Sequence, residues 1–77
     1  MKSLDLHGKS YEVAEELAFK FIDRNINDTP IQVITGNSVE MQKIVKNIAD
    51  KYNLKIEPKT YYNLGCLVIK WFWFIHD

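Results

Sequence analysis

The chain has 77 residues and carries ten Lys and Arg against ten Asp and Glu, which gives a net charge of zero at pH 7. This length suits one small domain and excludes a second one, while 47% hydrophobic and 26% charged residues exclude an intrinsically disordered tail. Zero net charge also excludes a global field that would attract nucleic acid or anionic lipid, so any polyanion site has to be local.

The first half of the sequence predicts a β-α-β unit. Ser3 to His7 alternate polar and apolar residues, as in a half-buried strand, and Gly8 breaks the pattern. An amphipathic helix is expected from Ser10, its cap, to about Asn27. Its apolar positions are Ala14, Leu17, Ala18, Phe21 and Ile22. After turn residues 28–30, the β-branched run 31–35 predicts a second strand.

The second half predicts a helix and a β-hairpin. Asn37 and Glu40 have the spacing of a capping box, and helical periodicity continues to about Tyr52. The apolar positions of this helix are Met41, Ile44, Val45, Ile48 and Tyr52. Residues 54–57 alternate, residues 61–63 have turn character and residues 65–71 favour a strand. We therefore expect one domain over residues 1–77 in the order β-α-β-α-β-β. This is an α/β arrangement, an α+β two-layer sandwich in which right-handed crossovers place both helices on one sheet face.

Three loops are candidates for an anion-binding rim beyond the carboxyl ends of the strands. These loops are His7 to Ser10, Gly36 to Ser38 and, if the last two strands are antiparallel, Tyr61 to Asn63. Gly8 and Gly36 allow a ligand to approach the backbone closely, and helix N-termini supply free N–H groups.

Asp5 and His7 are the candidate catalytic residues. Two positions apart on a strand, they share one face, where a carboxylate can orient a water or hold a metal ion and an imidazole can transfer a proton. This combination suits phosphodiester cleavage. The alternative is that both are simply the polar positions of a half-exposed strand.

Other residues of the rim could bind nucleic acid. Lys9, Lys43 and Lys46 could contact phosphates, and Tyr61 and Tyr62 could stack on bases. The alternatives are a solvated helix face for the lysines and ordinary packing for the tyrosines. Because nine of the ten basic residues are Lys, bidentate recognition of phosphate by arginine is not expected.

These motifs together resemble those of the Smr (small MutS-related) domain family. The likeness rests on Leu4-Asp5-Leu6-His7-Gly8, on Val33-Ile34-Thr35-Gly36 and on Gly65 before the last strand, and it extends from Ser3 to about Trp71. The resemblance implies a fold similar to the C-terminal domain of a bacterial translation initiation factor, with a mixed four-stranded sheet in the order 1-2-4-3.

The resemblance also implies DNA or RNA binding and, as in several members, nicking or endonuclease activity. Asp5 and His7 match the L-D-x-H motif held to matter for cleavage, and Thr35 and Gly36 match the start of the T-G-x-G loop. The cofactor stays open, with Mg²⁺ or Mn²⁺ as the candidates. The sequence departs from the family where Ser38 replaces the second glycine, and Glu40 beside it would repel a phosphate. The alternative reading is a degenerate site that binds nucleic acid, or a protein, without cutting.

The aromatic C-terminal extension, residues 72–77, follows Trp71 directly. Such aromatic density requires cover, and we expect either that it folds over the open sheet face near Ile34, Cys66 and Val68 or that it forms a homodimer. The apolar stretch from Leu64 to Ile75 is shorter than the ~20 residues that span a bilayer. The single cysteine and the absence of an apolar run after Met1 predict a cytoplasmic protein without a membrane partner.

Overall fold

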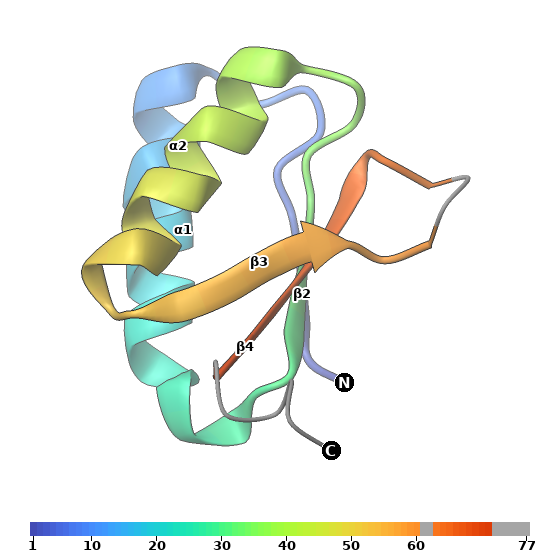
Figure 1. Ribbon diagram of the computed structural model, residues 1–77. Helices are drawn as coiled ribbons and strands as arrows, with labels where there is room; N and C mark the ends of the chain where they lie inside the picture. Colours follow the sequence, from blue (N-terminus) through green and yellow to red (C-terminus); the bar gives the residue numbers. More distant parts are fainter. Residues whose placement is uncertain (61–62, 72–77) are drawn as a thin grey trace.

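A computed structural model describes residues 1–60 and 63–71, and this part of the chain forms a four-stranded sheet with two α-helices against one face (Figure 1). The strands are β1 (Ser3–Asp5), β2 (Ile31–Ile34), β3 (Leu54–Pro58) and β4 (Cys66–Trp71). The helices are α1 (Tyr11–Arg24) and α2 (Val39–Lys51), with a short 3-10 helix, η1 (Ile26–Asp28).

The strand order is β1-β2-β4-β3. β1 is parallel to β2, whereas β4 is antiparallel to both of its neighbours. In the register of the sheet, Leu4 is opposite Val33, and Val33 is opposite Leu67. The predicted two-layer architecture and the 1-2-4-3 order of a mixed sheet are confirmed.

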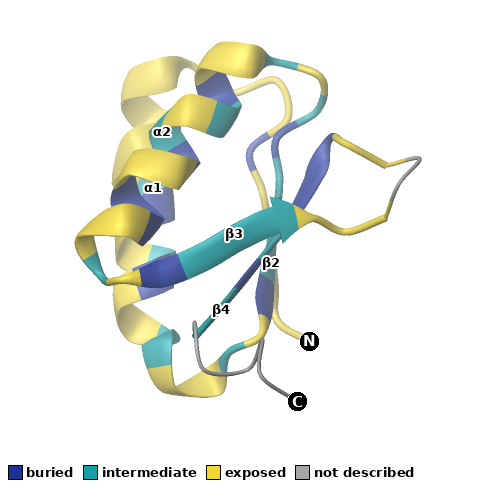
Figure 2. Cartoon of the chain, in the orientation of Figure 1, coloured by how far each residue is buried: buried dark blue, intermediate teal, exposed yellow. Residues whose placement is uncertain are grey.

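The hydrophobic core lies between the sheet and the helices (Figure 2). Alternation along the strands directs one set of side chains to this side, where Leu6, Ile31, Val33 and Ile69 are fully buried. The helices contribute their predicted apolar stripes. The buried helical residues are Ala14, Ala18, Ile22, Met41, Val45, Ile48 and Ala49.

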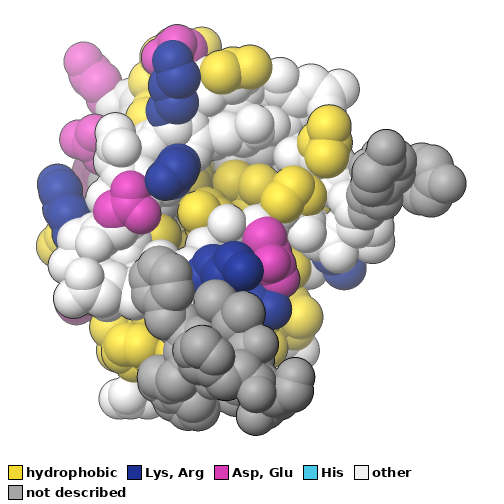
Figure 3. Space-filling view, viewed as in Figure 1, with side chains coloured by type: hydrophobic (Ala, Val, Ile, Leu, Met, Phe, Trp, Pro, Cys, Tyr) yellow, Lys and Arg dark blue, Asp and Glu magenta, His cyan; other side chains and the backbone are white. Residues whose placement is uncertain are grey.

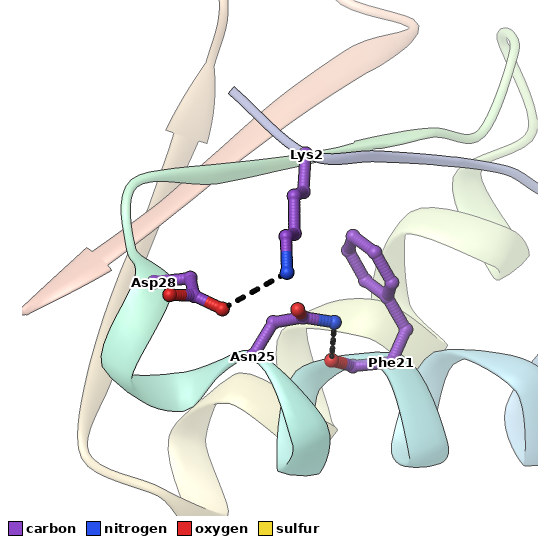
Figure 4. Close-up of polar contacts among 4 residues, drawn as sticks. All are labelled: Lys2, Phe21, Asn25 and Asp28. Atoms are coloured by element: carbon purple, nitrogen blue, oxygen red, sulfur yellow. Dashed lines mark hydrogen bonds and ion pairs between the residues drawn. The ribbon is translucent and has the colours of Figure 1, made fainter.

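The first helix ends three residues before the predicted end at Asn27. Asn25 is the reason, because its side-chain Nδ2 donates a hydrogen bond to the Phe21 carbonyl at 2.8 Å and the chain then tightens into η1 (Figure 4). The Lys2 ammonium lies 3.1 Å from Asp28 Oδ2 and ties the start of the chain to η1. The start of β1 and the end of α1 are thereby held together at the edge of the sheet away from the predicted rim.

Two expectations concern residues outside those that the structure describes: base stacking by Tyr61 and Tyr62, and docking or dimerisation of the extension 72–77. Trp71 is described; it ends β4 opposite Leu54 and packs, half-buried, against the core. Across residues 1–60 and 63–71, none of the helices is both long enough and apolar enough to cross a bilayer.

Candidate functional site

Three loops meet at one edge of the sheet, which we call the loop edge (residues 6–10, 35–38 and 63–65). β1 and β2 run in parallel, so their carboxyl ends both lead to this edge and to the first turns of α1 and α2 (Figure 1). β4 begins at the same edge because it is antiparallel to β2. The antiparallel pairing of β3 and β4 places the predicted third loop at this edge, and Tyr61 and Tyr62 of that loop lie outside the described residues.

His7 lies in a tight turn rather than on a strand. β1 ends at Asp5, and the Lys9 N–H donates to the Leu6 carbonyl at 3.1 Å to close the turn. Gly8, the third residue of this turn, has a φ of +79°, the left-handed conformation that a type II turn requires there. The prediction of a strand through His7 was therefore wrong at its end, because Gly8 turns the chain earlier.

Asp5 and His7 are nevertheless linked. The Asp5 carboxylate accepts a hydrogen bond from the His7 backbone N–H, with 2.9 Å between Oδ1 and N. A short acidic side chain that bonds the backbone two residues later is the pattern of an Asx turn. Both residues are exposed. The carboxylate thus fixes the turn that presents the imidazole to solvent.

The His7 ring lies beside Gly36. A Cβ atom added to Gly36 would be 3.2 Å from His7 Cδ2, and the φ of Gly36 is +68°. Two of the motifs singled out in the sequence, residues 4–8 and 33–36, therefore meet in space at this point.

Gly36 is held against Gly65 by backbone hydrogen bonds. The Gly65 carbonyl accepts from the Thr35 N–H at 2.8 Å and from the Gly36 N–H at 3.1 Å. The Thr35 hydroxyl, in a residue only 3% exposed, donates within the loops to the carbonyls of Gly36 at 2.9 Å and Gly65 at 3.3 Å. Thr35 and Gly65 are therefore buried residues that hold the loops of this edge together. The exposed Asn37 and Asn63 lie at its surface.

Serine residues cap both helices at this edge. Ser10 accepts from the Val13 N–H at 3.3 Å, as predicted, and Ser38 accepts from the Met41 N–H at 3.2 Å. The predicted capping box of Asn37 and Glu40 is wrong, because α2 begins one residue later. Glu40 is then too early in the first turn to reach back to the cap, and its carboxylate lies 3.8 Å from the Lys43 ammonium.

The candidate lysines differ in their ion pairs. Lys43 pairs with Glu40, and Lys46 lies 3.4 Å from Asp50, both along the exposed surface of α2. Lys9, in the turn after His7, forms no ion pair with a described residue. Figure 3 shows the same mixing on the face that it draws, where basic and acidic side chains lie next to one another. The positive charge available to a phosphate is therefore small.

Gln42 is a residue of this edge that the sequence pattern does not mark. Its Nε2 lies 3.3 Å from both the Gly36 carbonyl and the Leu64 carbonyl, so that it joins two loops that are far apart in the chain. A glutamine in the first turns of a helix carries no local signal of such a bridge.

Within the described residues, three or more His, Cys, Asp or Glu side chains do not gather into a group that could hold a metal ion. A divalent ion at Asp5 would therefore take most of its oxygen ligands from water or from a bound phosphate, as Mg²⁺ often does.

Comparison of the chain with models of protein families gives no match, and a search of curated proteins finds no significant relative.

Proposed function

We propose that this chain is an Smr-like domain that binds nucleic acid at the loop edge and cuts a phosphodiester bond there. One observation carries the proposal: the exposed His7 ring lies beside Gly36, so the Asp-x-His-Gly turn and the Thr-Gly loop form one surface. Each motif alone is common, but their meeting at the first turns of two helices is what a phosphate-directed site requires.

Binding of a phosphate would depend more on helix dipoles and backbone N–H groups than on charged side chains. The first turns of α1 and α2 offer N–H groups and the positive ends of two helix dipoles, each contributing about 0.3–1 kcal/mol toward an anion. Gly8 leaves space for a phosphate near the backbone, because nothing lies within 4 Å of the Cβ that it lacks, and Lys9 supplies a cation. We therefore expect weak binding at physiological salt with a shallow salt dependence.

The chemistry assigned to the edge is general acid–base catalysis. His7 removes a proton from an attacking water, whose oxygen bonds to phosphorus while the bond from phosphorus to the leaving oxygen breaks. Asp5 holds the His7 turn through Oδ1, which leaves Oδ2 for a water or a divalent ion. The leaving oxygen takes its proton from solvent.

The test is nicking of supercoiled plasmid and cleavage of structured RNA, with and without Mg²⁺ or Mn²⁺. His7→Ala should abolish cutting. Asp5→Asn retains an acceptor for the His7 N–H but loses the charge, so it should also abolish cutting while the circular dichroism spectrum stays unchanged. Glu15→Gln, which removes an exposed acid elsewhere on α1, is the matched control. If both site variants still cut at the wild-type rate, the catalytic proposal is rejected.

A second candidate function is nucleic-acid binding without cleavage. It is favoured by the positions of Ser38, which caps α2 where the family has its second glycine, and of Glu40, an acid in the first turn of α2. A gel shift of the same substrates, with no nicked product under any metal condition, would select this function over the first.

A further inference from the structure

Exposed apolar side chains gather at the loop edge. Six large hydrophobic residues of the described chain are strongly exposed, and three of them lie within this edge or directly beside it in the chain. Tyr11 is the first residue of α1 and is 53% exposed, Val39 is the first residue of α2 and is 60% exposed, and Leu64 precedes β4 and is 56% exposed. Half of this exposed set thus lies at the ends of the loops that form this edge.

Packing of the domain does not explain why these three exposed side chains are apolar. Tyr11 continues the stripe of Ala14 and Ala18 by one turn, but at that position it no longer reaches the core. Leu64 is held in place because its carbonyl accepts a hydrogen bond from Gln42 at 3.3 Å, while its side chain remains in solvent. The loop edge is therefore an ordered surface with an aromatic and two aliphatic groups.

The charge at this edge is too small for a duplex to be the preferred ligand. Duplex binding draws mainly on many phosphate contacts by Lys and Arg, whereas Lys43 and Lys46 are already paired with Glu40 and Asp50. An unpaired strand, in contrast, exposes the faces of its bases, and an aromatic side chain that stacks on a base binds it with little dependence on sequence. Apolar groups at the edge match that ligand.

We propose that the loop edge and the first residues of α1 and α2 bind unpaired nucleotides, with Tyr11 stacking on one base and Val39 and Leu64 contacting other bases of the same strand. Lys9 and His7 then face the sugar-phosphate backbone. This inference rests on the proposed function and specifies its substrate class: a single strand, or the unpaired part of a folded nucleic acid.

The experiment compares fluorescence anisotropy of a labelled single strand of about 12 nucleotides, within the site size of a small domain, with that of its duplex at low salt. The single strand should bind at least about fivefold more tightly. Tyr11→Ala should weaken its binding by about fivefold or more, since loss of one stacked base corresponds to about 1–3 kcal/mol. Tyr11→Phe should retain binding, because it keeps the ring.

Phe19→Ala is the matched control, since Phe19 is an aromatic residue of the same helix, 47% exposed and away from the loop edge. It should leave strand binding unchanged once thermal melts show that the variant is folded. A loss of binding in Tyr11→Ala and in Phe19→Ala alike would overturn the role of Tyr11.

The remaining outcomes separate this inference from the proposed function. If neither the strand nor the duplex binds, the proposed function itself fails. If the duplex binds as tightly as the strand, or more tightly, nucleic-acid binding stands and the preference for unpaired nucleotides is overturned. If Tyr11→Ala leaves strand binding intact but abolishes self-association in sedimentation, the exposed edge serves a second copy of this chain and the inference is overturned.

Discussion

Replacing Gly65 with alanine should destabilise the domain by about 2–4 kcal/mol. The added Cβ would lie 2.9 Å from the carbonyl carbon and oxygen of Gly36 and 3.1 Å from its Cα. A backbone cannot rotate away as a flexible side chain can, so the two loops must separate. Overpacking costs about 1–3 kcal/mol, and weakening the hydrogen bonds from the Thr35 and Gly36 N–H groups adds about 1 kcal/mol.

Thermal and urea melts monitored by circular dichroism would measure this loss. At about 4–8 °C per kcal/mol for a domain of this size, the melting temperature should fall by roughly 10 °C or more. Gly8→Ala is the control: its φ of +79° strains an alanine, but nothing lies within 4 Å of the added Cβ. The control should therefore lose only about 1–2 kcal/mol. A Gly65→Ala variant that melts with the wild type, or above Gly8→Ala, would refute the close backbone approach.

Three further predictions concern stability. Ser38→Ala should lower the free energy of unfolding by about 1 kcal/mol in urea melts, because the Met41 N–H at 3.2 Å loses its acceptor. Ser38→Asp keeps an acceptor and should not lower it. Equal midpoints for the wild type and both variants would contradict the cap. Ile69→Ala, at a fully buried position of β4, should cost about 2–5 kcal/mol by the same assay, and a cost well below this range would contradict its place in the core. The hydrogen bond from the Lys70 ammonium lowers the pKa of Glu57 below its usual value of 4.5. The pairing therefore stabilises the folded protein fully above the usual pKa, and this stabilisation is lost as the pH falls through the lower pKa of the folded state. Glu57→Gln should therefore lose less stability than the wild type between about pH 5 and 3, and identical acid melts would contradict the pairing.

Helices could be predicted from the sequence because their signal is local and repeated. The stripe that includes Ala14, Ala18 and Ile22 recurs with helical period, and the same residues are buried against the sheet. The sequence signal of β1 is weaker, because polar and apolar alternation over a few residues does not show where its pairing with β2 ends. Its end at Asp5 depends on the turn that Gly8 makes and on the bond from Asp5 to the His7 N–H.

The site could be predicted only where local motifs define it. Asn37 and Ser38 are both good helix caps, and the choice of Ser38 reflects how residues 35–36 are anchored to Gly65, about thirty positions later in the chain. The bridge made by Gln42 and the exposure of Tyr11 could not be predicted, for a related reason. The bridge made by Gln42 depends on a distant loop, and the exposure of Tyr11 depends on where the core ends.

The central place of β4 in the sheet constrains how the protein emerges from a ribosome. β4 pairs with β2 on one side and with β3 on the other, yet it is synthesised after both. Until residues 66–71 leave the exit tunnel, β3 has no strand partner and the inner side of β2 stays unpaired. At about 5–20 residues per second, this delay lasts on the order of a second. During it, the side of β2 that β4 will cover stays unpaired, and an unpaired strand side is a template for pairing with another chain.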